Sequence, residues 1–233
     1  MVEWRIIHKA ETASTNIDAR QGKPGDVFTA DFQSAGRGRL DHKWLGERGA
    51  NLAMSAVIDV SGIEPHEAAT LPLVIGLAVA EGLEPFAGPL MLKWPNDIYL
   101  SGRKLAGILC ERNGDSVIAG IGVNVRQREF PAEIASRAIS LVLSGSDASV
   151  EESRDAILAA LGNLVFRWRR NGFAAIWPRI AAIDHLKGRE VAVRQVDNGA
   201  AIRGVCGGIR RDGSLDVGGE AVWAGEATVE NIS

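Results

Sequence analysis

The sequence predicts an α+β fold, in which a mixed or antiparallel sheet packs against helices and a small all-β unit follows. Short apolar strands separated by tight turns succeed one another between residues 90 and 125, and two long stretches have helical spacing. Turn residues crowd the final segment of the chain. We therefore expect a larger domain over residues 1–186 and a small β domain over residues 187–233.

The first elements are short strands, expected over 3–7 and 27–32 because apolar and β-branched residues dominate both segments. Ser14 or Thr15 supplies the cap of a brief helix between them. The apolar run 51–60 is expected to form a longer strand.

A buried helix is expected after this strand. Ser61 and Glu64 have the spacing of a capping box, and the apolar run continues to Leu83. Pro72 must lie in a first turn or at a kink, so a helix boundary is expected near Thr70.

Four strands are expected next, over 90–93, 97–100, 104–111 and 116–125. Pro95, Gly102 and the pair Asn113-Gly114 separate them, as in consecutive strands joined by tight turns. These strands predict an antiparallel or mixed sheet.

A second capping box, Ser149 with Glu152, predicts a helix that ends near Asn171-Gly172. Its buried face should carry the residues that recur at helical spacing, namely Ile157, Leu161, Leu164 and Trp168.

The end of the chain has a different pattern. After a short helix that ends near Ile183, residues 190–196 alternate as in a strand and nothing helical is expected to follow. Closely spaced turns support a small β unit, at Asn198-Gly199, Gly207-Gly208, Asp212-Gly213 and Gly218-Gly219.

Composition excludes several classes of protein. The 233 residues carry a net charge of −3 with 46% hydrophobic residues, which fits a globular protein and not a surface that binds nucleic acid throughout. Cys110 and Cys206 have no disulfide or zinc spacing. The longest apolar run, 71–80, is shorter than the roughly 20 residues of a membrane span, and the N-terminus lacks a signal segment. We expect a cytoplasmic protein with no membrane or nucleic-acid partner.

The first candidate site is the loop that runs from Gln33 through Gly36-Arg37-Gly38-Arg39. Glycines let the backbone approach a ligand closely, and two guanidinium groups match phosphate or carboxylate oxygens. From this segment alone, a flexible surface loop with solvated arginines is an equal alternative.

Two further segments carry polar residues at strand ends. The sequence KWPND at 93–97 presents an amide and a carboxylate at a turn, although an ordinary Asx turn would also explain it. Lys104 opens the apolar segment KLAGIL, which favours an ammonium at the mouth of a hydrophobic slot over a surface lysine. In GIGVNV at 120–125, the glycines admit a flat group and Asn124 could pair with a heterocycle.

Taken together, Ser14-Thr15-Asn16, the GRGR loop, Trp44, KWPND, KLAGIL and GIGVNV resemble, in order and separation, the catalytic domain of biotin protein ligases. The resemblance covers about residues 5–185. It implies the class II synthetase-like fold of biotin and lipoate ligases. The tail is similar, more weakly, to the small C-terminal SH3-like barrel of this family.

The resemblance implies a reaction in two steps. Biotin and ATP form biotinyl-5'-AMP and pyrophosphate, with Mg²⁺, and the biotinyl group then passes to a lysine of a biotin carboxyl carrier protein. Two anions must approach each other in the first step, so cations must offset their repulsion. The resemblance assigns this catalytic role to Arg37, Arg39 and Lys104.

The resemblance also implies the binding residues. Those for biotin are Ser14, Thr15, Asn16, Gln33, Gly36, Arg37, Gly38, Lys104 and Gly107. Those for ATP or the adenylate are Arg37, Arg39, Trp44, Lys93, Asn96, Asp97 and Asn124, with Asp97 as a ligand of magnesium.

The loop departs from the family pattern GRGRRGRxW, because Leu40, Asp41 and His42 stand where the family often has Arg, Gly and Arg. We therefore expect retention of the adenylate to depend on Arg37, Arg39 and Lys43.

Some family members carry an N-terminal DNA-binding winged helix. A first strand at residues 3–7 leaves no room for that module, so a monofunctional ligase is expected.

Three alternatives remain at this point. A lipoate or octanoate ligase would use the same adenylation chemistry. A non-catalytic biotin-binding homologue would keep the pocket without transfer, and an RNA-binding module would use the arginine loop alone. An exposed sheet edge could dock the carrier or pair two copies in a homodimer.

Overall fold

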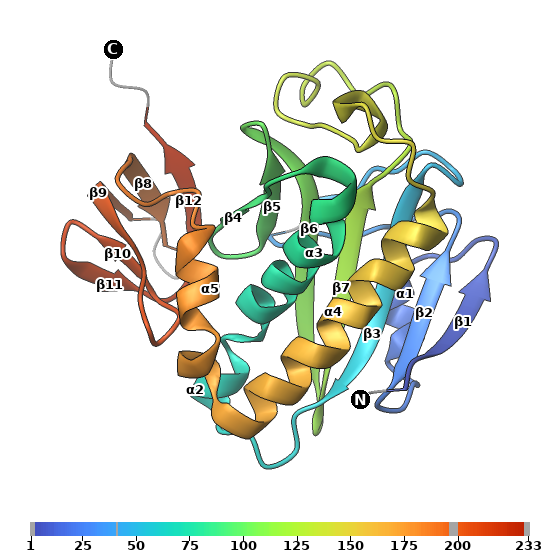
Figure 1. Ribbon diagram of the computed structural model, residues 1–233, viewed down its shortest axis with the longest axis horizontal. Helices are drawn as coiled ribbons and strands as arrows, with labels where there is room; N and C mark the ends of the chain where they lie inside the picture. The colour runs from blue at the N-terminus through green and yellow to red at the C-terminus, as the bar shows by residue number, and fades with distance from the viewer. Residues whose placement is uncertain (1–2, 41, 196–199, 231–233) are drawn as a thin grey trace.

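The computed structural model describes residues 3–40, 42–195 and 200–230, so Asp41 and the expected turn at Asn198-Gly199 lie outside the described residues. Its main sheet has seven strands in the order β1-β2-β3-β7-β6-β5-β4 (Figure 1). β1 and β2 are parallel and the other pairs are antiparallel, which confirms the mixed sheet. The strands are β1 (Arg5–Lys9), β2 (Asp26–Ala30), β3 (Asn51–Asp59), β4 (Met91–Lys93), β5 (Asp97–Leu100), β6 (Arg103–Asn113) and β7 (Ser116–Asn124).

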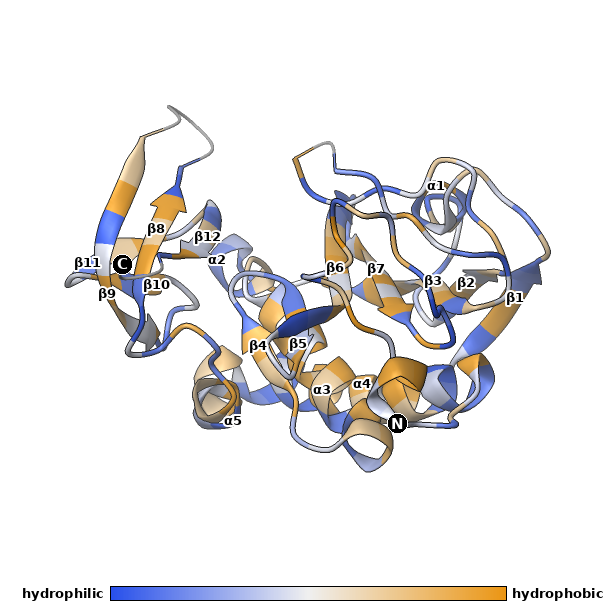
Figure 2. Ribbon diagram, turned by 90° about the horizontal axis from the view of Figure 1, so that it is seen from above, coloured by the Kyte–Doolittle hydropathy of each residue, from blue (hydrophilic) through white to orange (hydrophobic). Residues whose placement is uncertain are grey.

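Helices cover both faces of this sheet. Figure 2 shows α3 (Leu71–Ala87) and α4 (Val150–Asn171) on one side and α1 (Thr15–Ala19) on the other. The remaining helical segments are α2 (Pro65–Ala68), η1 (Val142–Ser144), η2 (Phe173–Ala175) and α5 (Trp177–Ala182). The α+β fold class is therefore confirmed.

The two predicted capping boxes have different outcomes. At α4, the Glu152 N–H donates to Ser149 Oγ at 3.1 Å and the Ser149 N–H donates to Glu152 Oε2 at 2.8 Å, which confirms the box. The box at Ser61 is wrong, because the Ser61 N–H donates to the Asp59 carboxylate in a turn and α2 starts only at Pro65. Proline at the first helical position fixes this later start.

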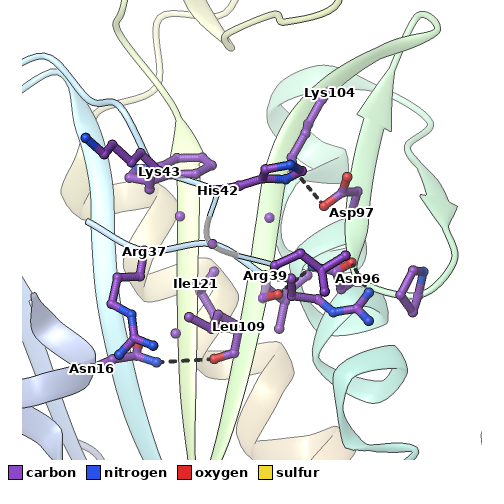
Figure 3. Close-up of a pocket in the computed structure, with 18 of the residues that line it drawn as sticks. Asn16, Arg37, Arg39, His42, Lys43, Asn96, Asp97, Lys104, Leu109 and Ile121 are labelled. Carbon is purple, nitrogen blue, oxygen red and sulfur yellow. Dashed lines mark hydrogen bonds and ion pairs between the residues drawn. The ribbon is translucent and has the colours of Figure 1, made fainter. Parts of the chain in front are cut away.

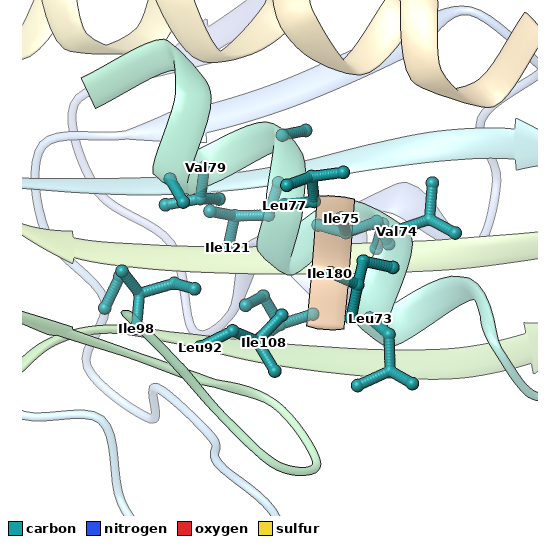
Figure 4. Packing of buried hydrophobic residues seen from close by; sticks show 14 of the residues in the cluster. Leu73, Val74, Ile75, Leu77, Val79, Leu92, Ile98, Ile108, Ile121 and Ile180 are labelled. Atoms are coloured by element: carbon teal, nitrogen blue, oxygen red, sulfur yellow. The ribbon is translucent and has the colours of Figure 1, made fainter. Parts of the chain in front are cut away.

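α3 is the central core helix. Apolar side chains cover nearly all of it because it lies between the sheet and α4. By length and apolarity the segment 65–87 could span a membrane, yet 67% of its most apolar window is buried inside the protein. Figure 4 shows this packing for Leu73, Val74, Ile75, Leu77 and Val79 of α3 with Leu92, Ile98, Ile108 and Ile121 of the sheet.

The five-stranded second sheet is antiparallel, in the order β11-β10-β9-β8-β12. This confirms the small all-β unit. Closure into an SH3-like barrel is not confirmed, because among the described residues β11 and β12 form the two ends of an open sheet. The strands are β8 (Glu190–Arg194), β9 (Ala201–Ile209), β10 (Leu215–Val217), β11 (Glu220–Val222) and β12 (Glu226–Val229).

Hydrogen bonds join the small sheet and its turns to the rest of the fold. The Trp94 indole donates to the Gly213 carbonyl at 3.1 Å, and the Trp177 indole donates to the Ile209 carbonyl at 2.7 Å. The buried Asp184 carboxylate accepts from the Ile209 N–H at 2.8 Å. One apolar cluster includes residues of both sheets, so the boundary at residues 186–187 remains a prediction.

The close approach of α3 to α4 predicts a difference between two helical glycines. A Cβ on Gly82 would lie 2.8 Å from the Ile157 Cα, whereas a Cβ on Gly76 would meet the Leu92 Cδ1 methyl at 2.7 Å. Alanine improves helix propensity equally at both positions, by about 1 kcal/mol. Because backbone cannot rotate away as a methyl can, we expect Gly82→Ala to lower the free energy of unfolding by about 1–3 kcal/mol relative to Gly76→Ala in urea titrations. Equal stabilities would contradict this packing.

The junction also predicts a pH dependence. His185 is buried with its ring 4.8 Å from the Tyr99 ring, and burial, helped by Arg189 and Lys93, lowers its pKa to about 4. The unfolded chain, with a histidine pKa near ~6.5, therefore binds more protons between these values, and stability falls as the pH drops through this window. Between pH 7 and pH 4.5, wild type should lose about 2 kcal/mol more unfolding free energy than His185→Gln. Parallel losses in urea titrations of both proteins would refute the assignment.

Candidate active site

A cleft lies between the arginine loop, described over residues 33–40 and 42–44, and strands β6 and β7 (Figure 3). Its empty volume, including the part open to solvent, is about 930 Å³. The start of α1, the turn between β4 and β5, and β12 complete its walls.

Most of the side chains singled out in the sequence line this cleft. Among the predicted catalytic and binding residues, all of which lie in the described part of the chain, Gly36 and Asn124 do not line it. The predicted residues that the structure brings together are Ser14, Thr15, Asn16, Gln33, Arg37, Gly38, Arg39, Trp44, Lys93, Asn96, Asp97, Lys104 and Gly107.

Hydroxyl and amide groups gather at one end, which we call the hydroxyl–amide end and which comprises Ser14, Thr15, Asn16 and Gln33. The Thr15 N–H donates to Gln33 Oε1 at 2.8 Å, and the Thr15 hydroxyl lies 3.1 Å from the same oxygen. This fixes the Gln33 amide with Nε2 as its remaining donor. Within the described residues, neither Gln33 Nε2 nor the Ser14 hydroxyl has a hydrogen-bond partner, so both can bind a ligand.

Asn16 differs from its neighbours because the protein already uses its amide. Its Nδ2 donates to Glu111 Oε2 at 2.7 Å, and its Oδ1 accepts from Ser55 Oγ at 2.6 Å. It also packs so closely that a Cβ on Gly120 would lie 2.2 Å from Oδ1. The sequence suggested direct ligand contact for Asn16, whereas this geometry favours a supporting role.

Ser55 and Glu111 were missed by the sequence reasoning. Ser55 is the lone hydroxyl in the apolar strand β3, and that isolation is a signal that could have identified it. Glu111 follows the KLAGIL segment closely, but nothing in the spacing indicates that its carboxylate reaches α1.

Cationic side chains gather at the other end, which we call the cationic end and which comprises Arg39, Lys93 and Lys104 around Asp97. Lys104 Nζ lies 2.7 Å from Asp97 Oδ1. Arg39 Nη1 donates to Asn96 Oδ1 and to the Gly225 carbonyl, each at 3.3 Å.

Burial makes these charges costly. It lowers the pKa of the Arg39 guanidinium and of the Lys93 ammonium, and in both cases the negative charges of Asp97 and Glu226 partly offset the effect. The Lys93 ammonium also lies 5.4 Å from the centre of the Tyr99 ring. A desolvated site with this excess of cations favours an anionic ligand.

Arg37 does not join the cationic end. Its guanidinium extends toward Asn16 (Figure 3), and Nη1 lies 3.5 Å from Glu111 Oε1. The sequence grouped Arg37 with Arg39 and Lys104. The structure places all three in one cleft but directs Arg37 to the hydroxyl–amide end.

Glycines of two motifs make room for Trp44. A Cβ on Gly122 would lie 2.6 Å from the Trp44 indole Cε2, and a Cβ on Gly36 would lie 2.7 Å from the Trp44 carbonyl oxygen. The Trp44 N–H also donates to the Gly36 carbonyl at 3.0 Å. Gly36 thus shapes the loop from outside the cleft, and the flat group that packs on GIGVNV in this structure is the Trp44 indole.

Asn124 is buried outside the cleft. Its Nδ2 donates to the Ile139 carbonyl at 3.0 Å and so holds the segment after β7 against the sheet. This geometry therefore does not place Asn124 where it could contact adenine. That contact remains a prediction.

The small sheet contributes a wall that spacing could not predict. Glu226 and Ala227 of β12 line the cleft, and Gly225 accepts a hydrogen bond from Arg39. These residues follow the other motifs by about 100 positions, which leaves no local pattern to connect them.

The part of the arginine loop that differs from the family pattern also reaches the cleft, which Leu40 and His42 line. The Gly38 N–H donates to the His42 carbonyl at 2.7 Å, and Leu40 has a left-handed backbone with φ of 50°. Reliance of adenylate retention on Arg37, Arg39 and Lys43 remains a prediction.

The contact between Gly122 and Trp44 predicts a spectroscopic effect. Gly122→Ala should displace the indole, because a methyl group cannot occupy a position 2.6 Å from the ring. We expect the near-ultraviolet circular dichroism and the tryptophan emission to change. In a Trp44→Phe background the same substitution should leave the emission unaltered. A signal change that persists in that background would argue against this contact.

Comparisons with known proteins identify the relatives of this chain. A family model described as "Biotin/lipoate A/B protein ligase family" matches residues 5–127. The chain is 33% identical over 200 residues to the bifunctional ligase/repressor BirA of Escherichia coli K12, an alignment that covers 83% of this chain and 61% of that protein. It is 33% identical over 247 residues to the biotin–[acetyl-CoA-carboxylase] ligase of Mycobacterium tuberculosis H37Rv, covering 98% and 90%.

A solved structure agrees over nearly the whole fold. The biotin protein ligase from Aquifex aeolicus in complex with biotin and ATP has a TM-score of 0.86 and 31% identity, covering 97% of this chain and 98% of that one. The chain spans less than two thirds of the E. coli protein but most of the M. tuberculosis and A. aeolicus ligases. These matches confirm the resemblance seen in the motifs, and the chain belongs to the biotin protein ligase family.

Proposed function

We propose that this protein is an ATP-dependent biotin protein ligase that forms biotinyl-5'-AMP and transfers the biotinyl group to a lysine of a biotin carboxyl carrier protein. The observation that carries the proposal is the polarity of the cleft. Uncharged donors and acceptors form one end, where Glu111 holds the Arg37 guanidinium beside them. Three cations gather around a carboxylate at the other end, and an apolar strand segment connects the two. Biotin and ATP present matching groups in the same order, namely the ureido head, the apolar valeryl chain, and the carboxylate next to the phosphates.

Biotin fits the first part of the cleft. The ureido head needs both donors and acceptors, and the Ser14 hydroxyl and Gln33 amide supply them. Ile108 and Leu109 line the path of the valeryl chain. Gly107 lies where the path reaches the cationic end, since a Cβ there would be 3.3 Å from Lys104 Nζ.

The cationic end suits the chemistry of adenylation. An oxygen of the biotin carboxylate attacks the α-phosphorus of ATP, and the bond to pyrophosphate breaks as the leaving group takes the electron pair. Negative charge accumulates on the phosphoryl oxygens, where Lys104 and Arg39 stabilise it. In the second step, the carrier lysine amine attacks the acyl carbon and AMP leaves.

Magnesium would be held mainly by the nucleotide. The described residues contain no cluster of three metal-ligating side chains, but the carboxylates of Asp97 and Glu226 both line the cleft. Mg²⁺ commonly binds one or two carboxylates together with substrate phosphates, so this donor set fits it. When bound, the ion would neutralise phosphate charge.

The nearest alternative is a lipoate or octanoate ligase, and the family description names lipoate beside biotin. Those acids lack ureido N–H groups, and the hydroxyl–amide end would then have no matching partner. The alternative of a non-catalytic homologue rests on the loop departure alone. A homodimer, carrier docking at a sheet edge, a cytoplasmic location and the absence of membrane and nucleic-acid partners remain predictions.

Two assays test the proposal. Pyrophosphate exchange should depend on biotin and be absent with lipoate or octanoate. Incubation with a biotin carboxyl carrier domain, labelled biotin and ATP should label one lysine of that domain. Exchange with lipoate in place of biotin would favour the alternative ligase, and exchange without transfer would leave an adenylate-forming protein that is not a protein ligase.

Removing a cation from the reacting end should slow adenylation. We expect Lys104→Ala and Arg39→Ala each to slow pyrophosphate exchange. The activation free energy should rise by about 2–4 kcal/mol, as when an oxyanion-stabilising donor is lost. Lys23→Ala, at an exposed lysine outside the cleft, is the matched control and should retain the wild-type rate. Wild-type exchange in both site variants would overturn the assigned roles.

A further inference from the structure

The Glu111 carboxylate lies behind the hydroxyl–amide end and contacts two elements of the cleft wall. Oε2 accepts from Asn16 Nδ2 at 2.7 Å. Oε1 lies 3.5 Å from Arg37 Nη1 and 3.3 Å from Arg20 Nη2. Glu111 itself does not line the cleft, so it can act on a ligand only through these partners.

The bond to Asn16 orients a buried amide. Ser55 holds the Oδ1 side, and Glu111 holds the Nδ2 side. Without the carboxylate, the remaining contact of Nδ2 is the Leu109 carbonyl at 3.5 Å, which is at the limit of a hydrogen bond. Because Asn16 follows Ser14 and Thr15 at the start of α1, a turn of its amide would disturb the groups that face the ligand.

The ion pair with Glu111 determines where the Arg37 guanidinium lies. The Arg37 side chain is 49% exposed, and pairs at such exposed positions add little to stability. The pair can nevertheless select among the positions open to the side chain. It holds the guanidinium beside the hydroxyl–amide end, away from the crowded cations Arg39 and Lys104.

We propose that Glu111 is a positioning residue for recognition of the ureido end of biotin, acting through the Asn16 amide and the Arg37 guanidinium. This inference rests on the proposed function and adds a residue that the cleft lining does not contain. A residue that acts only at this end should affect the binding of biotin and leave the binding of ATP and the chemical step unaltered.

The test compares Glu111→Ala with Glu111→Gln. Calorimetry with biotin alone gives the Kd, and pyrophosphate exchange gives KM for biotin, KM for ATP and kcat. Glu111→Ala should raise the Kd and KM for biotin about tenfold, equivalent to about 1.4 kcal/mol, with KM for ATP and kcat within about twofold. Glu111→Gln should be intermediate, because its side-chain carbonyl still accepts from Asn16 while the ion pair is lost.

Arg20→Gln is the matched control, since it removes the third partner of Glu111 without altering the cleft lining, and it should bind biotin as wild type does. Biotin binding within twofold of wild type in Glu111→Ala overturns the inference alone. Loss of kcat and of both affinities together, with no rescue in Glu111→Gln, indicates a merely structural role and also overturns it. Wild-type protein that does not bind biotin overturns the proposed function first.

Discussion

The crowding of cations around Asp97 is the constraint on which the rest of the cleft depends. Arg39 and Lys93 are desolvated, so their charged forms are costly, and Asp97 with Glu226 offsets only part of that cost. An anionic ligand that enters this end supplies the missing negative charge. The loop, the turn between β4 and β5, and the small sheet each contribute a group to this one arrangement, which none of them could form alone.

The fold was predictable wherever local sequence determines local structure. Ser149 with Glu152 and Ser61 with Glu64 share one spacing, yet only the first forms a capping box. The difference lies outside the motif, because Pro65 fixes a later helix start. Barrel closure could not be predicted either, since it depends on whether two edge strands meet.

The sequence predicted which residues line the cleft better than it predicted how their side chains are oriented. Motif spacing identified most of the lining residues, because strand ends and glycine loops carry their side chains to a common opening. The direction of Arg37 and the engagement of Asn16 depend on Glu111, which reaches both across the sheet. Partners of this kind follow from tertiary packing and leave no trace in periodicity.

Tryptophan explains why the distant β12 can serve as a wall of the cleft. Trp94 is buried and Trp177 is partly buried against the core, and each has one N–H donor. Trp94 donates to the Gly213 carbonyl in the turn between β9 and β10, and Trp177 donates to the Ile209 carbonyl at the end of β9. These bonds connect the small sheet to the main domain at two separate points. Because the turn that contains Trp94 leads directly into Asp97, the first residue of β5, the same short segment positions the carboxylate at the cationic end and contacts the small sheet that supplies Glu226. The two carboxylates that offset the buried cations are therefore both connected to this short segment.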